Sequence, residues 1–212
     1  VRFLGKLAQG DLGPSFKQKD FSVNDLIRTG LPVSLALGGI ALILALSIGM
    51  TIGVFAGLRP GSTLDIVLMS VSNLNIAIPT IAAAPVFILL FSVSLGWLPA
   101  GGTGSYRHFI LPAIALSLPY VAAIARLMRG SIAEANLEPH VRTAHAKGLS
   151  MPRIVLKHLL PGASIPLISF LGPAAAGLLT GSVVVEQIFD LPGIGRYFVQ
   201  GALNRDYTLV MG

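Results

Sequence analysis

The sequence predicts an all-α membrane protein with several spans, and three observations support this prediction. Of the 212 residues, 53% are hydrophobic and only 11% are charged, whereas a soluble domain carries about 25% charged residues. Four apolar runs exceed the roughly 20 helical residues that cross a bilayer or come close to that length. Six of the fifteen Lys and Arg residues lie between Arg126 and Lys157, beside these runs. Positive-inside topology explains this placement, so the net charge of +6 does not indicate a nucleic-acid partner.

Polar segments flank the membrane region. We expect residues 1–30 to form an extracytoplasmic segment in which Ser22 and Asp25 cap a short helix leading into the first span. Residues 186–206 are polar again, and Phe198, Val199 and Leu203 are spaced for one face of a short interfacial helix. The sequence begins without methionine and ends inside a new apolar run. We therefore expect a fragment that lacks the first span and most of the last.

The predicted spans are residues 31–58, 66–98, 109–129 and 160–185. The second is interrupted by Pro79 and Pro85, which should bend it because proline removes a backbone donor. The first and fourth spans carry glycines at four-residue spacing, which let a neighbouring helix approach closely. These helix-packing candidates are Gly49, Gly53, Gly57, Gly177 and Gly181.

Counts of Lys and Arg orient the spans. The turn at Arg59 and the segment from Arg126 to Lys157 fall on one side if the spans alternate, and together they hold seven basic residues. The loop of residues 96–108 on the other side holds only Arg107. The loop of residues 130–159 is therefore predicted to be cytoplasmic, in a multi-pass protein of the cytoplasmic (inner) membrane.

A basic, punctuated segment of residues 142–161 stands between two apolar runs. Glu138 and Pro139 suit the start of a helix, and Gly148 suits the left-handed position that ends one. Ser150 is positioned to cap a second helix, which should run to a break at Pro161 and Gly162. Two short helices meeting at a glycine corner need packing to be stable, either on their own bundle or on a partner. The small residues before Gly148 favour a partner groove.

This segment resembles the cytoplasmic loop of type I ABC importer permeases, whose pattern is Glu-Ala-Ala, three residues, Gly, nine residues, Ile-x-Leu-Pro. Arg142-Thr143-Ala144, Gly148 and His158-Leu159-Leu160-Pro161 match that spacing throughout. Arg142, Thr143 and His158 depart from the pattern in the way the peptide-transporter branch does. GDLGPSFKQKDFSVNDLI and LPGIGRYFVQGALNRDY also look like the outer segments of oligopeptide permeases, so the resemblance covers essentially the whole chain.

The resemblance implies a MetI-like fold, with residues 31–212 as an ABC transporter type-1 transmembrane domain. It implies a permease subunit of an ATP-driven, binding-protein-dependent importer of oligopeptides or dipeptides. The expected partners are a second permease, two cytoplasmic ATPase subunits and an extracytoplasmic peptide-binding protein. The loop of residues 138–161 would couple ATPase closure to alternating access. The residues carried over by position to the ATPase-coupling contact are Arg142, Thr143, Ala144, Ala146, Lys147, Gly148, Leu149 and Pro161.

Other chemistries find little support. No phosphate-binding G-x-x-x-x-G-K-[ST] loop is present, so ATP and Mg are expected on the partner ATPases and no cofactor on this chain. His140 and His145 are five residues apart and do not share a helical face, which argues against a metal site. No catalytic constellation is visible, so an enzyme is not expected. The alternatives are a secondary transporter or channel fragment, which leaves the loop spacing unexplained, a lipid-binding basic loop, or an importer permease for nickel, opine-like or glycosidic solutes.

Overall fold

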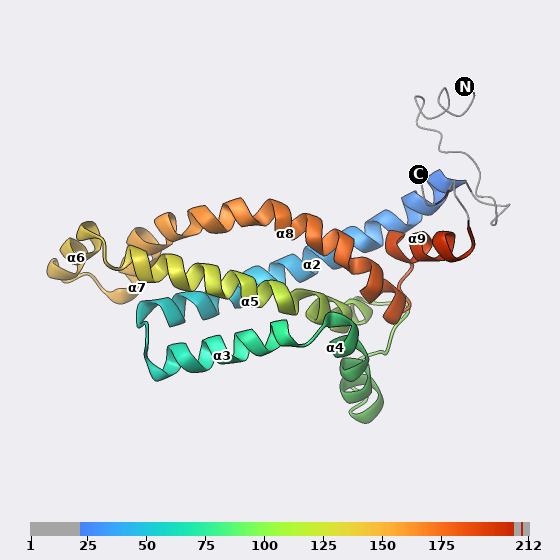
Figure 1. The fold of residues 1–212 in the computed structure, drawn as a ribbon, viewed down its shortest axis with the longest axis horizontal. Coiled ribbons are helices and arrows are strands. Elements are labelled where there is room, and N and C mark those ends of the chain that lie inside the picture. The colour runs from blue at the N-terminus through green and yellow to red at the C-terminus, as the bar shows by residue number, and fades with distance from the viewer. Residues whose placement is uncertain (1–21, 206–208, 210–212) are drawn as a thin grey trace, which may run out of the picture. The chain divides into compact units, whose positions relative to one another are not determined.

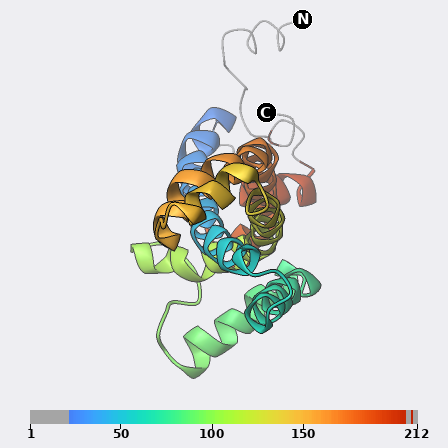
Figure 2. The same cartoon turned by 90° about the vertical axis from the view of Figure 1, so that its left-hand side faces the viewer.

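The computed structural model describes residues 22–205 and 209, and every element in them is a helix (Figures 1 and 2). The chain divides into two compact units. Among the described residues, unit 1 comprises residues 22–40, Ile81–Leu116 and residues from 178 onward, and unit 2 comprises Ala41–Thr80 and Ser117–Gly177. The long helices α2 (Val23–Leu58), α5 (Ile110–Ala135) and α8 (Leu160–Ile188) each contribute residues to both units.

Within the described residues, three helical stretches are long and apolar enough to cross a membrane: Val23–Leu58, Tyr106–Ala135 and Met151–Ile188. A fourth crossing results if Thr63–Ile76 and Thr80–Ser94 are counted together as one bent span. The prediction of an all-α, multi-pass fold is therefore confirmed.

The first helix starts earlier than predicted, at Val23 rather than at residue 31. The predicted cap is present: the Asp25 amide donates to Ser22 Oγ at 3.2 Å, and the Ser22 amide donates to Asp25 Oδ2 at 3.3 Å. This reciprocal capping satisfies two backbone donors that a helix start leaves free. The capped turn continues without interruption into the apolar run, so the helix predicted to lead into the first span is continuous with it.

The second predicted span is two helices, as its prolines indicated. α3 (Thr63–Ala77) ends at Ile78, whose backbone is extended (φ −96°, ψ 112°), and Pro79 follows. A residue before proline is disfavoured in the α conformation, so the break falls where sterics place it. α4 (Thr80–Phe87) contains Pro85 and leads into a π-helix, η1 (Ile88–Ser94).

The remaining predicted helices form with shifted limits. A short 3₁₀ turn, η2 (Tyr106–Phe109), precedes α5, which runs past Arg126 and Arg129 as expected. α8 extends to Ile188, so Glu186 lies inside a helix and not in a polar outer segment. α9 (Ile194–Leu203) is the predicted short helix that carries Phe198 and Leu203.

Unit 1 contains a buried polar contact between α2, α8 and the start of α9. Ser34 Oγ donates to Glu186 Oε1 at 2.7 Å and accepts from the Ile194 amide at 2.9 Å. Glu186 is fully buried, and its Oε2 has no hydrogen-bond partner among the described residues. A Cβ added to Gly193 would overlap this carboxylate, so the glycine lets the backbone of the turn pass against it.

Unit 2 is organised by the close approach of α2 and α5. A Cβ on Gly49 would lie 2.8 Å from the Val121 carbonyl oxygen, and one on Gly53 would lie 2.6 Å from that of Ala125. Gly57 repeats the contact one turn later, 2.7 Å from the Arg129 carbonyl oxygen. The three glycines therefore let the two backbones approach to a distance that side chains would prevent.

The second pair of packing candidates behaves differently. A Cβ on Gly177 would overlap the Tyr120 hydroxyl, so Gly177 leaves room for a side chain. A Cβ on Gly181 would lie 3.6 Å from Leu116 Cδ1, which is ordinary van der Waals contact. The glycine spacing of α8 thus does not produce the backbone approach seen for α2.

Candidate functional site

The segment that follows α5 forms two short helices in unit 2. They are α6 (Pro139–Ala146) and α7 (Met151–Ile154), and α7 passes into a π-helix, η3 (Val155–Leu159), before α8 begins. Figure 1 shows α6 and α7 beyond the end of α5. We call residues 138–161 the loop segment.

α6 begins and ends as its sequence predicts. Glu138 has extended backbone angles and accepts from the Val141 amide at 3.1 Å, with Pro139 in the first helical turn. At the other end the Leu149 amide donates to the Ala144 carbonyl at 3.3 Å, and the Gly148 amide donates to that of His145 at 2.9 Å. This pair of bonds is a Schellman motif, which needs a left-handed residue at its centre. Gly148 supplies it with φ +73°, so the predicted glycine corner is confirmed.

The second helix departs from the prediction. Ser150 occupies the N-cap position, but its side chain makes no capping hydrogen bond. The expected break at Pro161 is absent, and the chain is helical from Met151 to Ile188. Since an α-helical turn would press the proline ring against the carbonyl four residues earlier, the wider π turn of η3 provides the room that lets the helix continue. The Leu160 amide accordingly bonds to the Val155 carbonyl, five residues back.

One face of α6 is held by its own unit. Val141 and Ala144 are buried and pack in a cluster with Ile154 and Leu159 of the following helices and Ile132 of α5. This packing supplies the stability that an eight-residue helix lacks alone in water. The choice left open by the sequence is settled for this face: it packs on the chain's own bundle.

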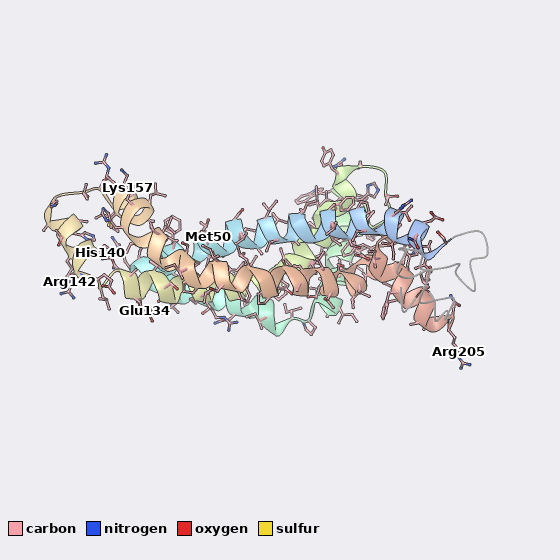
Figure 3. The ribbon with its side chains drawn as sticks, turned by 90° about the horizontal axis from the view of Figure 1, so that it is seen from above. Met50, Glu134, His140, Arg142, Lys157 and Arg205 are labelled. Carbon is pink, nitrogen blue, oxygen red and sulfur yellow. The ribbon has the colours of Figure 1, made fainter. Side chains whose placement is uncertain are left out.

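The opposite face of α6 is exposed. Figure 3 shows the Arg142 side chain of α6 pointing away from the bundle. The residues of the predicted coupling contact therefore separate into two groups. Ala144 is only 3% exposed and Leu149 is partly buried against the same cluster. The exposed members are Arg142, Thr143, Ala146, Lys147, Gly148 and Pro161.

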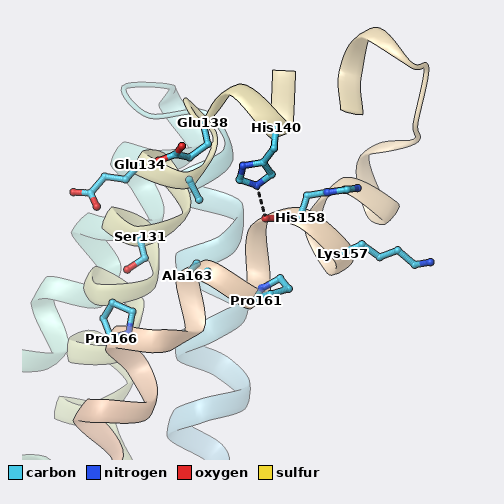
Figure 4. Close-up of a pocket in the computed structure, with 11 residues that line it drawn as sticks. Ser131, Glu134, Glu138, His140, Lys157, His158, Pro161, Ala163 and Pro166 are labelled. Atoms are coloured by element: carbon cyan, nitrogen blue, oxygen red, sulfur yellow. Dashed lines mark hydrogen bonds between the residues drawn. The ribbon is translucent and has the colours of Figure 1, made fainter. Parts of the chain in front are cut away.

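A pocket of about 510 Å³ lies beside α6, between the end of α5 and the start of α8. Glu134 and Glu138 stand on one side, and His140, Lys157 and His158 on the other (Figure 4). A His140 ring nitrogen is 3.4 Å from the His158 carbonyl oxygen, a long contact. No group of three or more His, Asp or Glu side chains suited to a metal ion occurs in residues 22–205.

An ion pair that the sequence does not reveal joins α3 to α5. Arg129 donates from Nε to Asp65 Oδ1 and from Nη2 to Oδ2, both at 2.6 Å. The Gly61 amide donates to the same Oδ2 at 2.8 Å, and Ser62 Oγ caps α3 by accepting from the Asp65 amide. The two charged residues are 64 positions apart, so only the fold brings them together.

Helices of this length and hydropathy, with a two-helix segment between two of them, define a polytopic membrane component. The family model for the binding-protein-dependent transport system inner membrane component matches residues 49–212. The chain belongs to this family.

Curated relatives match almost the full chain. The oligopeptide transport system permease protein OppB of Haemophilus influenzae is 52% identical over 99% of this chain and 69% of its own length. OppB of Escherichia coli K12 is 48% identical over the same shares. The dipeptide transport system permease protein DppB of Bacillus subtilis is 43% identical over all of this chain and 69% of its own.

Solved structures agree on the fold. The inward-facing MetNI methionine ABC transporter superimposes with a TM-score of 0.70 at 22% identity, covering 88% of this chain and 87% of that one. An amino acid ABC transporter solved with histidines gives a TM-score of 0.65 at 18% identity, covering 100% and 88%. The MetI-like fold is therefore confirmed. The family and the curated relatives, together with the apolar helices, make the protein a multi-pass component of the inner membrane and a transporter subunit.

Proposed function

We propose that the protein is the permease subunit of an ATP-driven, binding-protein-dependent importer of oligopeptides or dipeptides. Relatives that are 43–52% identical over 99–100% of the chain carry oligopeptide or dipeptide permease names. A secondary transporter or channel would share the helices but has no use for the loop segment. The peptide permease is therefore the favoured function, ahead of an importer for another solute.

The chain works with other subunits in this proposal. A second, similar permease completes the pathway, two cytoplasmic ATPase subunits bind ATP and Mg, and an extracytoplasmic binding protein delivers the peptide. This chain itself holds no cofactor. The family description, which names a binding-protein-dependent system, supports this set of partners.

The exposed face of α6 is the proposed docking surface for one ATPase subunit. The observation that carries this assignment is the division of α6 into a buried face and an exposed face. Val141 and Ala144 anchor the helix to the hydrophobic core of unit 2. A displacement imposed on the exposed face is therefore passed to that core and not lost in a flexible loop. Short amphipathic helices commonly dock into grooves by their free face.

The unbroken helix after the Gly148 corner can transmit a movement of the loop segment into the membrane region. Residues Met151–Ile188 form one helical stretch, so a movement of the loop segment is passed along α8 without a hinge at Pro161. Closure of the ATPase pair would in this way switch the permease between inward-facing and outward-facing states. Gly148 determines the angle between α6 and the helical stretch Met151–Ile188, because its left-handed backbone forms the corner.

The test is a bulky substitution on the exposed face. Ala146→Trp should abolish co-purification of the ATPase subunits and reduce uptake of a radiolabelled tripeptide at least ten-fold, because a large ring prevents close helix-in-groove contact. Ala100→Trp is the matched control: Ala100 is also exposed but lies in unit 1, outside the loop segment. It should leave ATPase binding unchanged.

Two results would contradict the proposal. If Ala146→Trp retains both ATPase binding and uptake, α6 is not the docking helix. If the wild-type complex binds its ATPase but transports nickel or a glycoside instead of peptides, the coupling role survives and the peptide assignment fails.

A further inference from the structure

A polar groove lies in unit 2 between α3 and α5, and none of its residues belongs to the loop segment. Its volume is about 480 Å³. It is lined by Asp65, Ile66, Met69, Ser70, Asn73, Arg126 and Arg129. A groove with this polar content is unusual beside helices whose other faces are largely apolar, and the proposed docking function does not use it.

The charges of the groove do not cancel. The Asp65 carboxylate accepts two hydrogen bonds from Arg129, which neutralises its charge, and a third from the Gly61 amide. Arg126 is exposed and forms no ion pair with any residue in the described ranges. The groove therefore keeps one net positive charge, located on a guanidinium that no acid neutralises.

The groove also combines two environments. Arg126 lies one helical turn from Arg129, which contacts the first turn of α3 beside the Gly61 turn. Farther along α3, Val71 is 53% exposed and Leu74 is 62% exposed, and such apolar side chains suit acyl chains. Ser70 and Asn73 add a hydroxyl and an amide to the lining of the same groove. A cation, neutral hydrogen-bonding groups and an adjoining apolar face match the phosphate, the glycerol esters and the acyl chains of a phospholipid.

We propose that this groove binds the phosphate of an anionic phospholipid in the cytoplasmic leaflet. Arg126 is the charged contact, since a planar guanidinium matches phosphate oxygens with paired donors. Ser70 and Asn73 contact the glycerol and ester oxygens, and the acyl chains follow the apolar face of α3. Basic pockets between membrane helices on the cytoplasmic side are suited to such headgroups.

The experiment is a lipid titration of the protein, purified with its partner subunits, followed by native mass spectrometry. The probes are palmitoyl-oleoyl phosphatidylglycerol and phosphatidylcholine with the same chains. The wild type should prefer phosphatidylglycerol by about five- to ten-fold, as expected for one strong basic contact. Arg126→Gln should reduce this preference to less than about two-fold, and Arg126→Lys should keep most of it because the charge remains.

The matched control is Arg59→Gln, which removes a positive charge from the neighbouring turn but not from the groove. It should leave the preference unchanged. The proposal is overturned if the wild type binds both lipids equally, if Arg126→Gln retains the preference, or if Arg59→Gln removes it to the same extent. It is also overturned if tripeptide displaces phosphatidylglycerol and Arg126→Gln raises the KM for uptake, because the groove would then line the substrate pathway.

Discussion

The Asp65–Arg129 ion pair should be a main contributor to the stability of unit 2, and Asp65→Asn tests this. The substitution keeps the shape of the side chain and removes its charge. Asp65 is 3% exposed at its side chain, while Arg129 is 35% exposed. The loss therefore affects one deeply buried group and one group with partial access to solvent.

The magnitude follows from this difference. Removing one partner of a fully buried pair costs about 3–5 kcal/mol, because the other charge is left uncompensated. Arg129 escapes part of this penalty by turning toward water or headgroups, which lowers the expected cost to about 2–3 kcal/mol. For a chain of this size, about 1 kcal/mol corresponds to 2–4 °C, so the melting midpoint should fall by roughly 5–10 °C.

Size-exclusion chromatography after heating detergent-solubilised protein measures this midpoint. The matched control is Asp190→Asn, which breaks the Arg196–Asp190 ion pair, whose acid is 71% exposed. Because exposed pairs contribute less than about 1 kcal/mol, and because asparagine tolerates the positive φ of residue 190, this control should shift the midpoint by less than about 3 °C. A shift for Asp65→Asn no larger than that of the control would refute the reasoning.

Two further substitutions test the backbone geometry. Gly53→Leu should prevent folding or lower the free energy of unfolding by more than about 3 kcal/mol, because its Cβ would lie 2.6 Å from a carbonyl oxygen of α5. The control is Gly39→Leu on the same helix, whose Cβ meets nothing within 4 Å and which should be tolerated. Expression level and thermal midpoint distinguish the two variants, and equal behaviour would contradict the packing argument. Gly148→Ala should lower the free energy of unfolding by about 1–2 kcal/mol and weaken ATPase co-purification, because the backbone of residue 148 is left-handed. The control, Gly130→Ala inside α5, should be neutral or slightly stabilising. An unchanged ATPase interaction in Gly148→Ala would show that the corner does not set the docking angle.

Local features were the most predictable. The break before Pro79, the capped start at Ser22 and the corner at Gly148 each depend on backbone preferences of a few neighbouring residues. The structure has all three near the predicted positions. Pro161 was the exception, because a π turn, which depends on five consecutive residues and their surroundings, replaces the expected break.

The candidate site was predictable in composition but not in its faces. The spacing of the motif residues was enough to locate the loop segment and to show its resemblance to importer permeases. Helical spacing puts Ala144 and Ala146 on different faces, but it does not say which face packs inward; in the structure Ala144 is buried and Ala146 is exposed. The two alanines are chemically identical, so only the position of α6 against its own core distinguishes an anchor from a contact residue.

The sequence by itself determined the membrane class, the helical segments and the loop spacing, because hydropathy, helix periodicity and glycine conformations are properties of short stretches. The tertiary structure decided which residues meet across the chain. It pairs Asp65 with Arg129 across 64 positions and Ser34 with Glu186 across 152. It also places Arg126, which pairs with no acid in residues 22–205, in a groove beside Arg129. Such contacts depend on how whole helices pack, since any helix offers several faces and packing chooses among them.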